Sequence, residues 1–205
     1  MSTSTQKPSG QTPPDLNASK ADLRRELRAR RNALGATAQA AAAQALIGQL
    51  AQLPGWPRSR RIALYLAADG EIDTGPLALE ARRQDRQLYL PVIDLDQHLD
   101  FALWEEADPL AVNRYGIGEP DKTATRIEPS QLDILFLPLV GWDTAGGRLG
   151  MGGGFYDRSL QGVSGPLLVG LAHDCQRVER VPTQDWDIKL DFVATGSALH
   201  HCRSA

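Results

Sequence analysis

Apolar residues recur at helical spacing in several segments of the chain. Leu23, Leu27 and Leu34 share one face of a helix that we expect to begin at Ser19, a residue type favoured as an N-cap, and to end before Gly35. An alanine-rich run that stops at Pro54-Gly55 predicts a second helix. The predicted helices run from Ser19 to about Leu34, from about Thr37 to Leu53, from Thr74 to Gln84, and from near Gly154 past Leu160.

Short apolar runs between these helices predict strands. They run from Arg61 to Leu66, Leu88 to Val92, Leu99 to Trp104, Asp133 to Val140, Leu167 to Ala172 and Phe192 to Thr195. Residues 133–140 are apolar nearly throughout, which is typical of a strand buried on both faces. Pro91 is expected to break the second strand, because proline lacks the amide hydrogen that a central strand donates.

Strands that alternate with helices predict an α/β fold. We expect a single three-layer domain over residues 18–196, Rossmann-like, with a mostly parallel (mixed) central sheet flanked by helices. Residues 1–17 are polar and rich in Pro, Ser and Thr, so we expect a disordered N-terminal tail, and residues 197–205 are expected to form a C-terminal tail.

Composition excludes several classes of protein. A net charge of −3 over 205 residues argues against a nucleic-acid binder that works through bulk electrostatics, and no apolar run approaches the length of a membrane span. Cys175 and Cys202 form no disulfide framework and lack metal-ligand spacing, which fits a reducing compartment. The start of the chain has no apolar signal segment. We therefore expect a cytoplasmic monomer.

A stretch of six glycines lies between residues 146 and 154, after the most apolar strand. Glycine at this density is typical of backbone that approaches an anion closely, usually a phosphate. The stretch matches neither the Walker pattern nor the dinucleotide fingerprint. Its neighbours Arg148 and Arg158 supply positive charge. A flexible surface loop is the alternative, but the pair Phe155-Tyr156 favours a nucleotide site.

Two further polar clusters follow predicted strands. Residues 68–71 follow the first strand, and residues 173–176 follow the strand 167–172, so both are expected to join the glycine stretch in one composite pocket. Asp73 or Thr74 is expected to cap the next helix, which leaves Glu71 to face the pocket, where a carboxylate suits the amidine-like edge of a pterin or purine. His173 has no Ser or Cys partner, so a structural role is favoured over a nucleophilic dyad.

Basic residues recur every three or four positions along the first predicted helix. Lys20, Arg24, Arg28 and Arg31 share one face of it. By itself such a face is typical of a solvated surface, but beside a phosphate loop it would supply cations to a triphosphate.

Several carboxylates follow the glycines or lie near the end of the chain. Asp157 is either a magnesium ligand or a charge at a helix N-terminus, and the two roles are compatible. Asp143 either supports the same metal or caps a turn, and the cap is favoured. One residue of the late acidic group Asp185, Asp187 and Asp191 is expected to reach the metal.

With these motifs in view, the chain resembles the 5-formyltetrahydrofolate cyclo-ligases, also called 5,10-methenyltetrahydrofolate synthetases. The resemblance spans about residues 20–195. It rests on Lys20-x-x-x-Arg24, Tyr65-Leu66 with Glu71-Ile72-Asp73-Thr74, Asn113-x-Tyr115-Gly116-Ile117-x-Glu119-Pro120, residues 137–143 (LPLVGWD) and residues 148–158 (RLGMGGGFYDR). It implies a reaction that needs ATP and Mg²⁺ and converts 5-formyltetrahydrofolate to 5,10-methenyltetrahydrofolate, with ADP and phosphate released. The formyl oxygen would attack the γ-phosphate, and N10 would then attack the activated carbon.

The resemblance also implies residue roles. The implied ATP contacts are Lys20, Arg24, Arg148, Leu149, Gly150, Met151, Gly152, Gly153, Gly154, Phe155 and Tyr156, with Arg148 and Tyr156 as catalytic residues. The implied folate contacts are Leu66, Glu71, Tyr115, Glu119, Met151 and Phe155. The implied magnesium ligands are Asp157 and Asp187.

At four positions the sequence departs from the family pattern. Met151 stands where many members have Tyr or another bulky or basic residue, Phe155 replaces the first Tyr of a pair, and Trp142 replaces the usual Phe. Gly153 stands where some members carry a lysine, so Arg148 or Lys20 would supply that charge. Two other functions stay open at this point: an ATP-independent sugar-phosphate isomerase-like enzyme that uses Glu71 and His173 as acid and base, and a nucleotide- or folate-binding module without turnover.

Overall fold

The computed structural model describes residues 16–202 of the chain. Its α-helices are α1 (Leu16–Asn32), α2 (Ala36–Leu50), α3 (Gly75–Arg83) and α4 (Phe155–Leu160). Short 3-10 helices are η1 (Trp56–Arg58), η2 (Pro129–Gln131) and η3 (Asp174–Gln176). Because α1 begins at Leu16, residues 16 and 17 belong to a helix and not to the predicted N-terminal tail. The rest of that tail, residues 1–15, lies outside the described residues.

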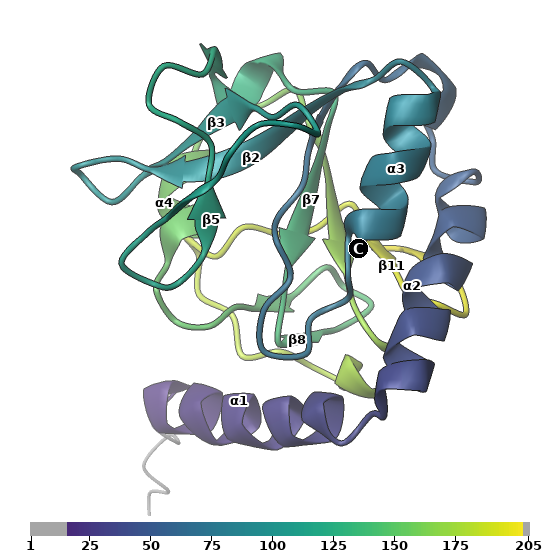
Figure 1. The fold of residues 1–205 in the computed structure, drawn as a ribbon. Coiled ribbons are helices and arrows are strands. Elements are labelled where there is room, and N and C mark those ends of the chain that lie inside the picture. Colours follow the sequence, from purple (N-terminus) through teal and green to yellow (C-terminus); the bar gives the residue numbers. More distant parts are fainter. Residues whose placement is uncertain (1–15, 203–205) are drawn as a thin grey trace, which may run out of the picture.

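Eight strands form the central sheet in the order β12-β11-β10-β7-β1-β2-β3-β6. They are β1 (Arg61–Ala63), β2 (Gln87–Ile93), β3 (Leu99–Leu103), β6 (Arg126–Ile127), β7 (Ile134–Pro138), β10 (Leu167–Leu171), β11 (Phe192–Ala194) and β12 (Leu199–His201). Neighbours from β11 through β2 pair in parallel, whereas β12, β3 and β6 pair antiparallel. The predicted mostly parallel, mixed α/β sheet is confirmed, and helices lie on both sides of it (Figure 1).

The two faces of the sheet bury separate apolar clusters, as alternation along each strand requires. Phe136 on β7 belongs to the cluster beneath α2 and α3, together with Leu46, Leu50 and Leu77. Leu135 and Leu137 on the same strand point into the opposite cluster, which includes Leu160 of α4. Strand β7 is therefore buried on both faces, which confirms the expectation from its apolar run.

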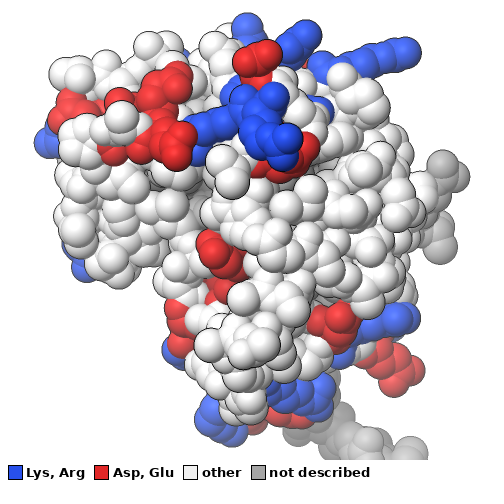
Figure 2. Space-filling view, turned by 45° about the vertical axis from the view of Figure 1, so that its right-hand side comes forward, with Lys and Arg blue, Asp and Glu red and all other residues white. Residues whose placement is uncertain are grey.

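The outer surface of this fold is unevenly charged. Helix α2 contains no Asp, Glu, Lys or Arg. Figure 2 shows charged side chains gathered toward opposite ends of the face in view, with wide uncharged areas between them.

Two boundaries from the sequence are wrong. Strand β2 runs through Pro91, which pairs with Phe101 of β3. The strand tolerates this proline because its pairing with β1 ends at Tyr89, so β2 has one partner there, like an edge strand. The domain also extends past residue 196, because residues 199–201 of the predicted C-terminal tail form β12 and pair with β11.

Helix α1 stands apart from the layers and lies across the end of the sheet, next to β8 (Figure 1). Its buried Leu27 packs with Val140, Leu149 and Val181. Leu149 belongs to the small hairpin of β8 (Gly141–Trp142) and β9 (Arg148–Leu149), and Val140 directly precedes it. This contact requires a residue without a side chain at Gly141, because a methyl group there would lie 2.3 Å from Leu27 Cδ1. Glycine thus lets α1 approach the segment that carries the glycine stretch.

Candidate active site

Three polar segments meet at the carboxyl ends of β1, β7 and β10, which are neighbours in the sheet. Residues 68–71 follow β1, the glycine stretch follows β7, and His173 follows β10. The first and last are in contact, because His173 Nε2 lies 3.2 Å from the carbonyl oxygen of Gly70. Ligands of parallel α/β sheets collect at this edge, so the structure places the predicted clusters where a shared site is expected.

Helix α1 forms the wall opposite the glycine stretch. Arg24 Nε donates a hydrogen bond of 2.8 Å to the carbonyl oxygen of Gly150, and Lys20 Nζ lies 2.7 Å from Asp187 Oδ2. The Lys20 side chain is only 11% exposed. The alternative of a solvated basic face is therefore wrong for Lys20 and Arg24, since both side chains contact the segments across from α1.

The glycine stretch is part strand and part turn. Residues 148 and 149 within it form β9, so Arg148 and Leu149 are buried in the hairpin and are not part of an open loop. Beyond them Gly152 has φ +104° and Gly154 has φ +67°. Both values lie in the left-handed region, which L side chains rarely adopt. This geometry explains two of the glycines without any ligand, and it leaves the Gly150–Gly154 backbone next to Arg24.

Asp157 in the first turn of α4 joins the two sides of the site. Its Oδ1 accepts hydrogen bonds from Arg148 Nη2 at 2.7 Å and from the backbone amide of Ile188 at 3.1 Å. Ile188 follows Asp187, so these two contacts bring the two predicted metal ligands into adjacent segments. The Arg148 side chain is 4% exposed, and its Nε has no hydrogen-bond partner within residues 16–202.

Tyr156 lies between the groups predicted for the two ligands. Burial raises the pKa of its hydroxyl, with a further rise from the negative charge of Glu71 and an opposing effect of Arg148. The hydroxyl is therefore protonated at neutral pH and available as a hydrogen-bond donor. Burial also raises the pKa of Glu71, while the amide of Ala68 and the charge of Arg31 lower it.

An apolar rim lies beside this polar centre. The rings of Tyr115 and Phe155 meet edge to face with centroids 5.6 Å apart, and Met151 is about half exposed. Glu119 Oε1 accepts hydrogen bonds from the amide of Ile93 at 3.0 Å and from Asn113 Nδ2 at 2.9 Å. Glu119 therefore fastens the hairpin of β4 (Ala111–Val112) and β5 (Gly118–Glu119), which presents Tyr115 at its turn.

Leu66 reaches the same hairpin from the other side. It is half-buried against the apolar cluster beneath α2 and α3. A methyl group at Gly118 would lie 3.2 Å from Leu66 Cδ1.

The remaining acidic candidates have other partners. Asp143 is buried and accepts hydrogen bonds from the amides of Ala145, Gly147 and Val181, so it caps the β8–β9 turn as favoured from the sequence. Asp191 accepts a hydrogen bond from the amide of Leu168, at the end of the sheet opposite the candidate site. Thr74 is the N-cap residue of α3, and Asp73 before it accepts a hydrogen bond from the amide of Gly75.

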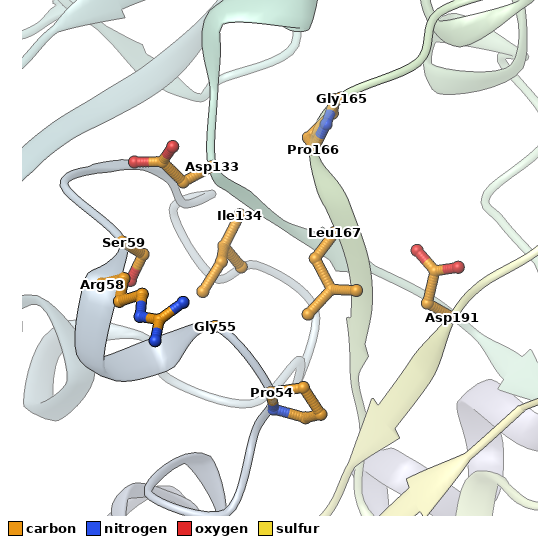
Figure 3. Close-up of a pocket in the computed structure, with 10 residues that line it drawn as sticks. All are labelled: Pro54, Gly55, Arg58, Ser59, Asp133, Ile134, Gly165, Pro166, Leu167 and Asp191. Carbon is orange, nitrogen blue, oxygen red and sulfur yellow. The ribbon is translucent and has the colours of Figure 1, made fainter.

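A pocket of about 490 Å³ opens at that opposite end. Ile134 and Leu167, the first residues of β7 and β10, form its floor, and Asp133 and Asp191 stand on either side of them (Figure 3). Among the candidate site residues, its lining includes Asp191 of the late acidic group and no other. Because it lies at the amino ends of the parallel strands, it does not fit the usual place for substrates in such sheets.

The described residues suit a magnesium ion that arrives with a phosphate, and they do not form a complete protein cage. Residues 16–202 contain no group of three or more His, Cys, Asp or Glu side chains placed to hold a metal. Asp157 and Asp187 offer hard carboxylate oxygens from adjacent segments. Mg²⁺ is commonly bound by one or two carboxylates together with substrate phosphates and waters, so this donor set fits.

Arg31 and Arg158 contribute more than sequence reasoning assigned to them. Arg158 Nη1 donates to the carbonyl oxygen of Gly153 at 2.8 Å, and its guanidinium lies 5.2 Å from the centre of the Phe155 ring. Arg31 is fully buried and pairs with Asp69 at 2.7 Å. The helical spacing from Lys20 was the signal for Arg31, but spacing alone does not reveal that a side chain is buried.

Comparisons with known proteins identify a family of relatives. The family model of the 5-formyltetrahydrofolate cyclo-ligases matches residues 16–196. A 5-formyltetrahydrofolate cyclo-ligase of Haemophilus influenzae is 40% identical over 179 residues, which cover 85% of this chain and 96% of that protein. One of Escherichia coli K12 is 40% identical over 178 residues, or 84% and 98% of the two chains.

Solved structures give the same result. The NMR structure of a 5,10-methenyltetrahydrofolate synthetase from Aquifex aeolicus aligns with a TM-score of 0.79 at 32% identity, over 91% of this chain and 94% of that one. The synthetase of Mycoplasma pneumoniae aligns with a TM-score of 0.70 at 25% identity, over 86% and 98%. This chain belongs to the 5-formyltetrahydrofolate cyclo-ligase family.

Proposed function

We propose that this protein converts 5-formyltetrahydrofolate to 5,10-methenyltetrahydrofolate in a reaction that consumes ATP, requires Mg²⁺ and releases ADP and phosphate. The observation that carries the proposal is the position of Tyr156, whose ring centre lies 5.7 Å from the Arg148 guanidinium and whose hydroxyl pKa is shifted by the charges of both Glu71 and Arg148. Glu71 is the candidate for pterin recognition, and Arg148 belongs to the candidate triphosphate site. Groups suited to the two substrates thus converge on one side chain.

Lys20, Arg24 and Arg148 bind the triphosphate of ATP together with the backbone of residues 149–154. Support comes from their convergence: Arg24 contacts Gly150, Lys20 contacts Asp187, and Arg148 contacts Asp157. Asp157 and Asp187 hold Mg²⁺, which neutralises charge on the phosphate oxygens when bound. Because Gly153 has no side chain, Lys20, Arg24 and Arg148 supply the positive charge at this loop.

The folate lies against Leu66, Glu71, Tyr115, Met151 and Phe155. The ionised carboxylate of Glu71 accepts hydrogen bonds from the amidine-like edge of the pterin ring. Tyr115 and Phe155 supply aromatic surface, and Glu119 supports the hairpin that presents Tyr115. The exposure of Tyr115 and Met151 supports this assignment, since large apolar side chains gathered at the surface commonly mark a binding site.

The chemistry asks for positioning and charge stabilisation more than for a protein nucleophile. The formyl oxygen attacks the γ-phosphorus and the bond to ADP breaks. N10 then attacks the formyl carbon, and phosphate leaves with that oxygen and takes up the proton lost from N10. Arg148 stabilises the negative charge on the phosphoryl oxygens, and the Tyr156 hydroxyl donates a hydrogen bond to an oxygen in transfer. His173 stays outside these steps, because burial lowers the pKa of its imidazole and its Nε2 contacts Gly70.

Incubation of the full-length protein with 5-formyltetrahydrofolate and Mg-ATP tests the proposal, with the near-ultraviolet absorbance of the methenyl product as readout. We expect product only when ATP and Mg²⁺ are both present. Binding of both ligands without product would favour a binding module, and turnover of a sugar phosphate without ATP would favour the isomerase alternative.

We further propose that the protein acts in the cytoplasm as a monomer, with ATP and 5-formyltetrahydrofolate as its partners. Cys175 and Cys202 are free cysteines, which fits a reducing compartment. Within residues 16–202, no helix is long and apolar enough to cross a membrane.

A further inference from the structure

Arg31 is a charged side chain with no exposure to solvent, near the end of α1. Its guanidinium reaches three residues in two segments: Nη2 lies 2.7 Å from Asp69 Oδ2, Nη1 donates to the carbonyl oxygen of Leu139 at 3.3 Å, and Nη1 lies 3.9 Å from Glu71 Oε1. Its Nε has no hydrogen-bond partner within residues 16–202. Burial of an arginine without full hydrogen bonding is costly, so this position requires a reason.

The pairing with Asp69 is not a sufficient reason. Arg28, one turn earlier on α1, also contacts Asp69 Oδ2 at 2.7 Å, and Asn32 Nδ2 donates to Asp69 Oδ1 at 3.2 Å. The hydrogen bond from Arg28 is the first cause that lowers the pKa of Asp69 to about 2. The half-exposed Arg28 therefore already pairs with Asp69. Arg31 differs from Arg28 in that it also contacts Glu71 and Leu139.

The turn that carries Glu71 depends on such support. Asp69 has φ +50° and Gly70 has φ +75°, so two successive residues adopt the left-handed conformation that L side chains rarely adopt. Glu71 Oε2 accepts the amide of Ala68 at 3.1 Å, which leaves Oε1 toward Arg31. The Arg31 guanidinium thus holds the turn from inside the protein. His173 also contacts this turn, through the carbonyl oxygen of Gly70.

We propose that Arg31 is a positioning residue for folate recognition, which holds the Glu71 carboxylate in place and in its ionised form. This inference rests on the proposed role of Glu71. The charged or titratable groups around Glu71 are Arg31 from α1, Asp69 from its own turn, Tyr65 after β1, Tyr156 from α4, and His173 behind Gly70. Within residues 16–202, Arg31 is the one cation that lowers the pKa of Glu71, while burial and Asp69 both raise it. Without Arg31, only the amide of Ala68 opposes these two effects.

The test measures binding of 5-formyltetrahydrofolate and of Mg-ATP separately, by calorimetric titration between about pH 6 and pH 8.5, with full-length variants. For Arg31→Met we expect folate affinity to fall about tenfold at neutral pH, because the Glu71 carboxylate loses the cation that holds it in place, and to fall further as the pH decreases. Mg-ATP affinity should change less than about twofold, a difference too small to reflect a lost charged contact. Arg28→Met is the matched control, because it removes a cation from Asp69 but not from Glu71, and its folate affinity should follow the wild-type pH profile.

Two more variants separate positioning from a merely structural role. Arg31→Lys keeps the charge and should restore the wild-type pH profile, and Arg31→Gln, which lacks the charge, serves as the test variant if Arg31→Met does not fold. Arg31→Met combined with Glu71→Gln should bind folate no more weakly than Glu71→Gln alone, because Arg31 acts through that carboxylate. Equal losses of folate and ATP affinity, or unchanged folate binding in the uncharged Arg31 variant, would overturn the inference. Unchanged folate binding by Glu71→Gln would overturn it too, while wild-type turnover would leave the proposed reaction standing.

Discussion

Replacement of Gly141 by alanine should loosen α1 and the glycine stretch together. The added methyl group would lie 2.3 Å from Leu27 Cδ1, whereas ordinary contacts begin near 3.4 Å, so one group must retreat by 3.4 − 2.3 = 1.1 Å. Leu27 has no free space to move into, because it is fully buried against Val140, Leu149 and Val181. The displacement therefore passes to α1 itself.

The expected size of the effect follows from this packing. Extra methyl groups in a filled core cost about 1–3 kcal/mol, and we expect Gly141→Ala to lower the free energy of unfolding by that amount. Arg24 lies one turn before Leu27 and donates to Gly150 at 2.8 Å. A retreat of about 1 Å would break that hydrogen bond, so nucleotide affinity should fall about tenfold, equivalent to about 1.4 kcal/mol.

Urea unfolding and Mg-ATP titration measure the two effects. Gly48→Ala is the control, because Gly48 lies inside α2 with no atom within 4 Å of the added methyl group, and it should stabilise the protein by about 0.5–1 kcal/mol. Leu27→Ala alone should cost about 2–5 kcal/mol, and the double variant should cost less than the sum of the single ones. Additive losses, or a Gly141→Ala protein as stable as the wild type, would refute the close approach as the reason for glycine.

The other predictions concern charge. Asp157→Ala should lower turnover at least about a hundredfold and weaken its dependence on Mg²⁺, whereas Mg²⁺ dependence that is intact in the absorbance assay would exclude Asp157 as a ligand. Lys20→Met should weaken Mg-ATP binding about tenfold in titrations and leave folate binding unchanged, since Lys20 contacts Asp187 and not the folate side. Pairing holds the pKa of Asp69 in the folded protein at about 2, below its ordinary pKa of 3.8. The stability that Asp69 contributes is therefore present at pH values above 3.8 and is lost as the pH falls through the folded-state pKa of about 2. Asp69→Asn should therefore flatten the decline of unfolding free energy over this acid range, and an unchanged decline would contradict the pairing.

The fold class was predictable because most of its elements carry periodic patterns. The apolar run before the glycine stretch predicted β7, and the spacing of the leucines in α1 predicted the buried face of that helix. Strands β8 and β9 have two residues each, too few for any period, so they were missed although they shape the site. Strand β12 contains His200 and His201, two polar residues that are typical of a solvated tail in sequence. In the structure the ring of His201 stacks on that of Phe192, with ring centroids 4.6 Å apart.

The side-chain partners within the site were less predictable than its members. Glycines, basic residues and carboxylates identified which residue types gather, since those types suit phosphate and metal. Arg24 and Gly150 are separated by 126 positions in sequence, and only the tertiary packing of α1 on the hairpin brings them together. The burial of Arg31 has the same origin, because residues of the Ala68–Glu71 turn, far along the chain, close over it.

The two ion pairs Lys20–Asp187 and Arg148–Asp157 give the site a way to discriminate between its ligands. Each candidate metal ligand already has a cation beside it, and each of those cations is a candidate phosphate contact. A bare nucleotide would attract the cations and leave two carboxylates facing its negative charge. A free metal ion would attract the carboxylates and leave a buried arginine unpaired, which is costly. Only the metal–nucleotide complex would offer a new partner to all four side chains, so we expect the protein to bind the metal and the nucleotide as one ligand.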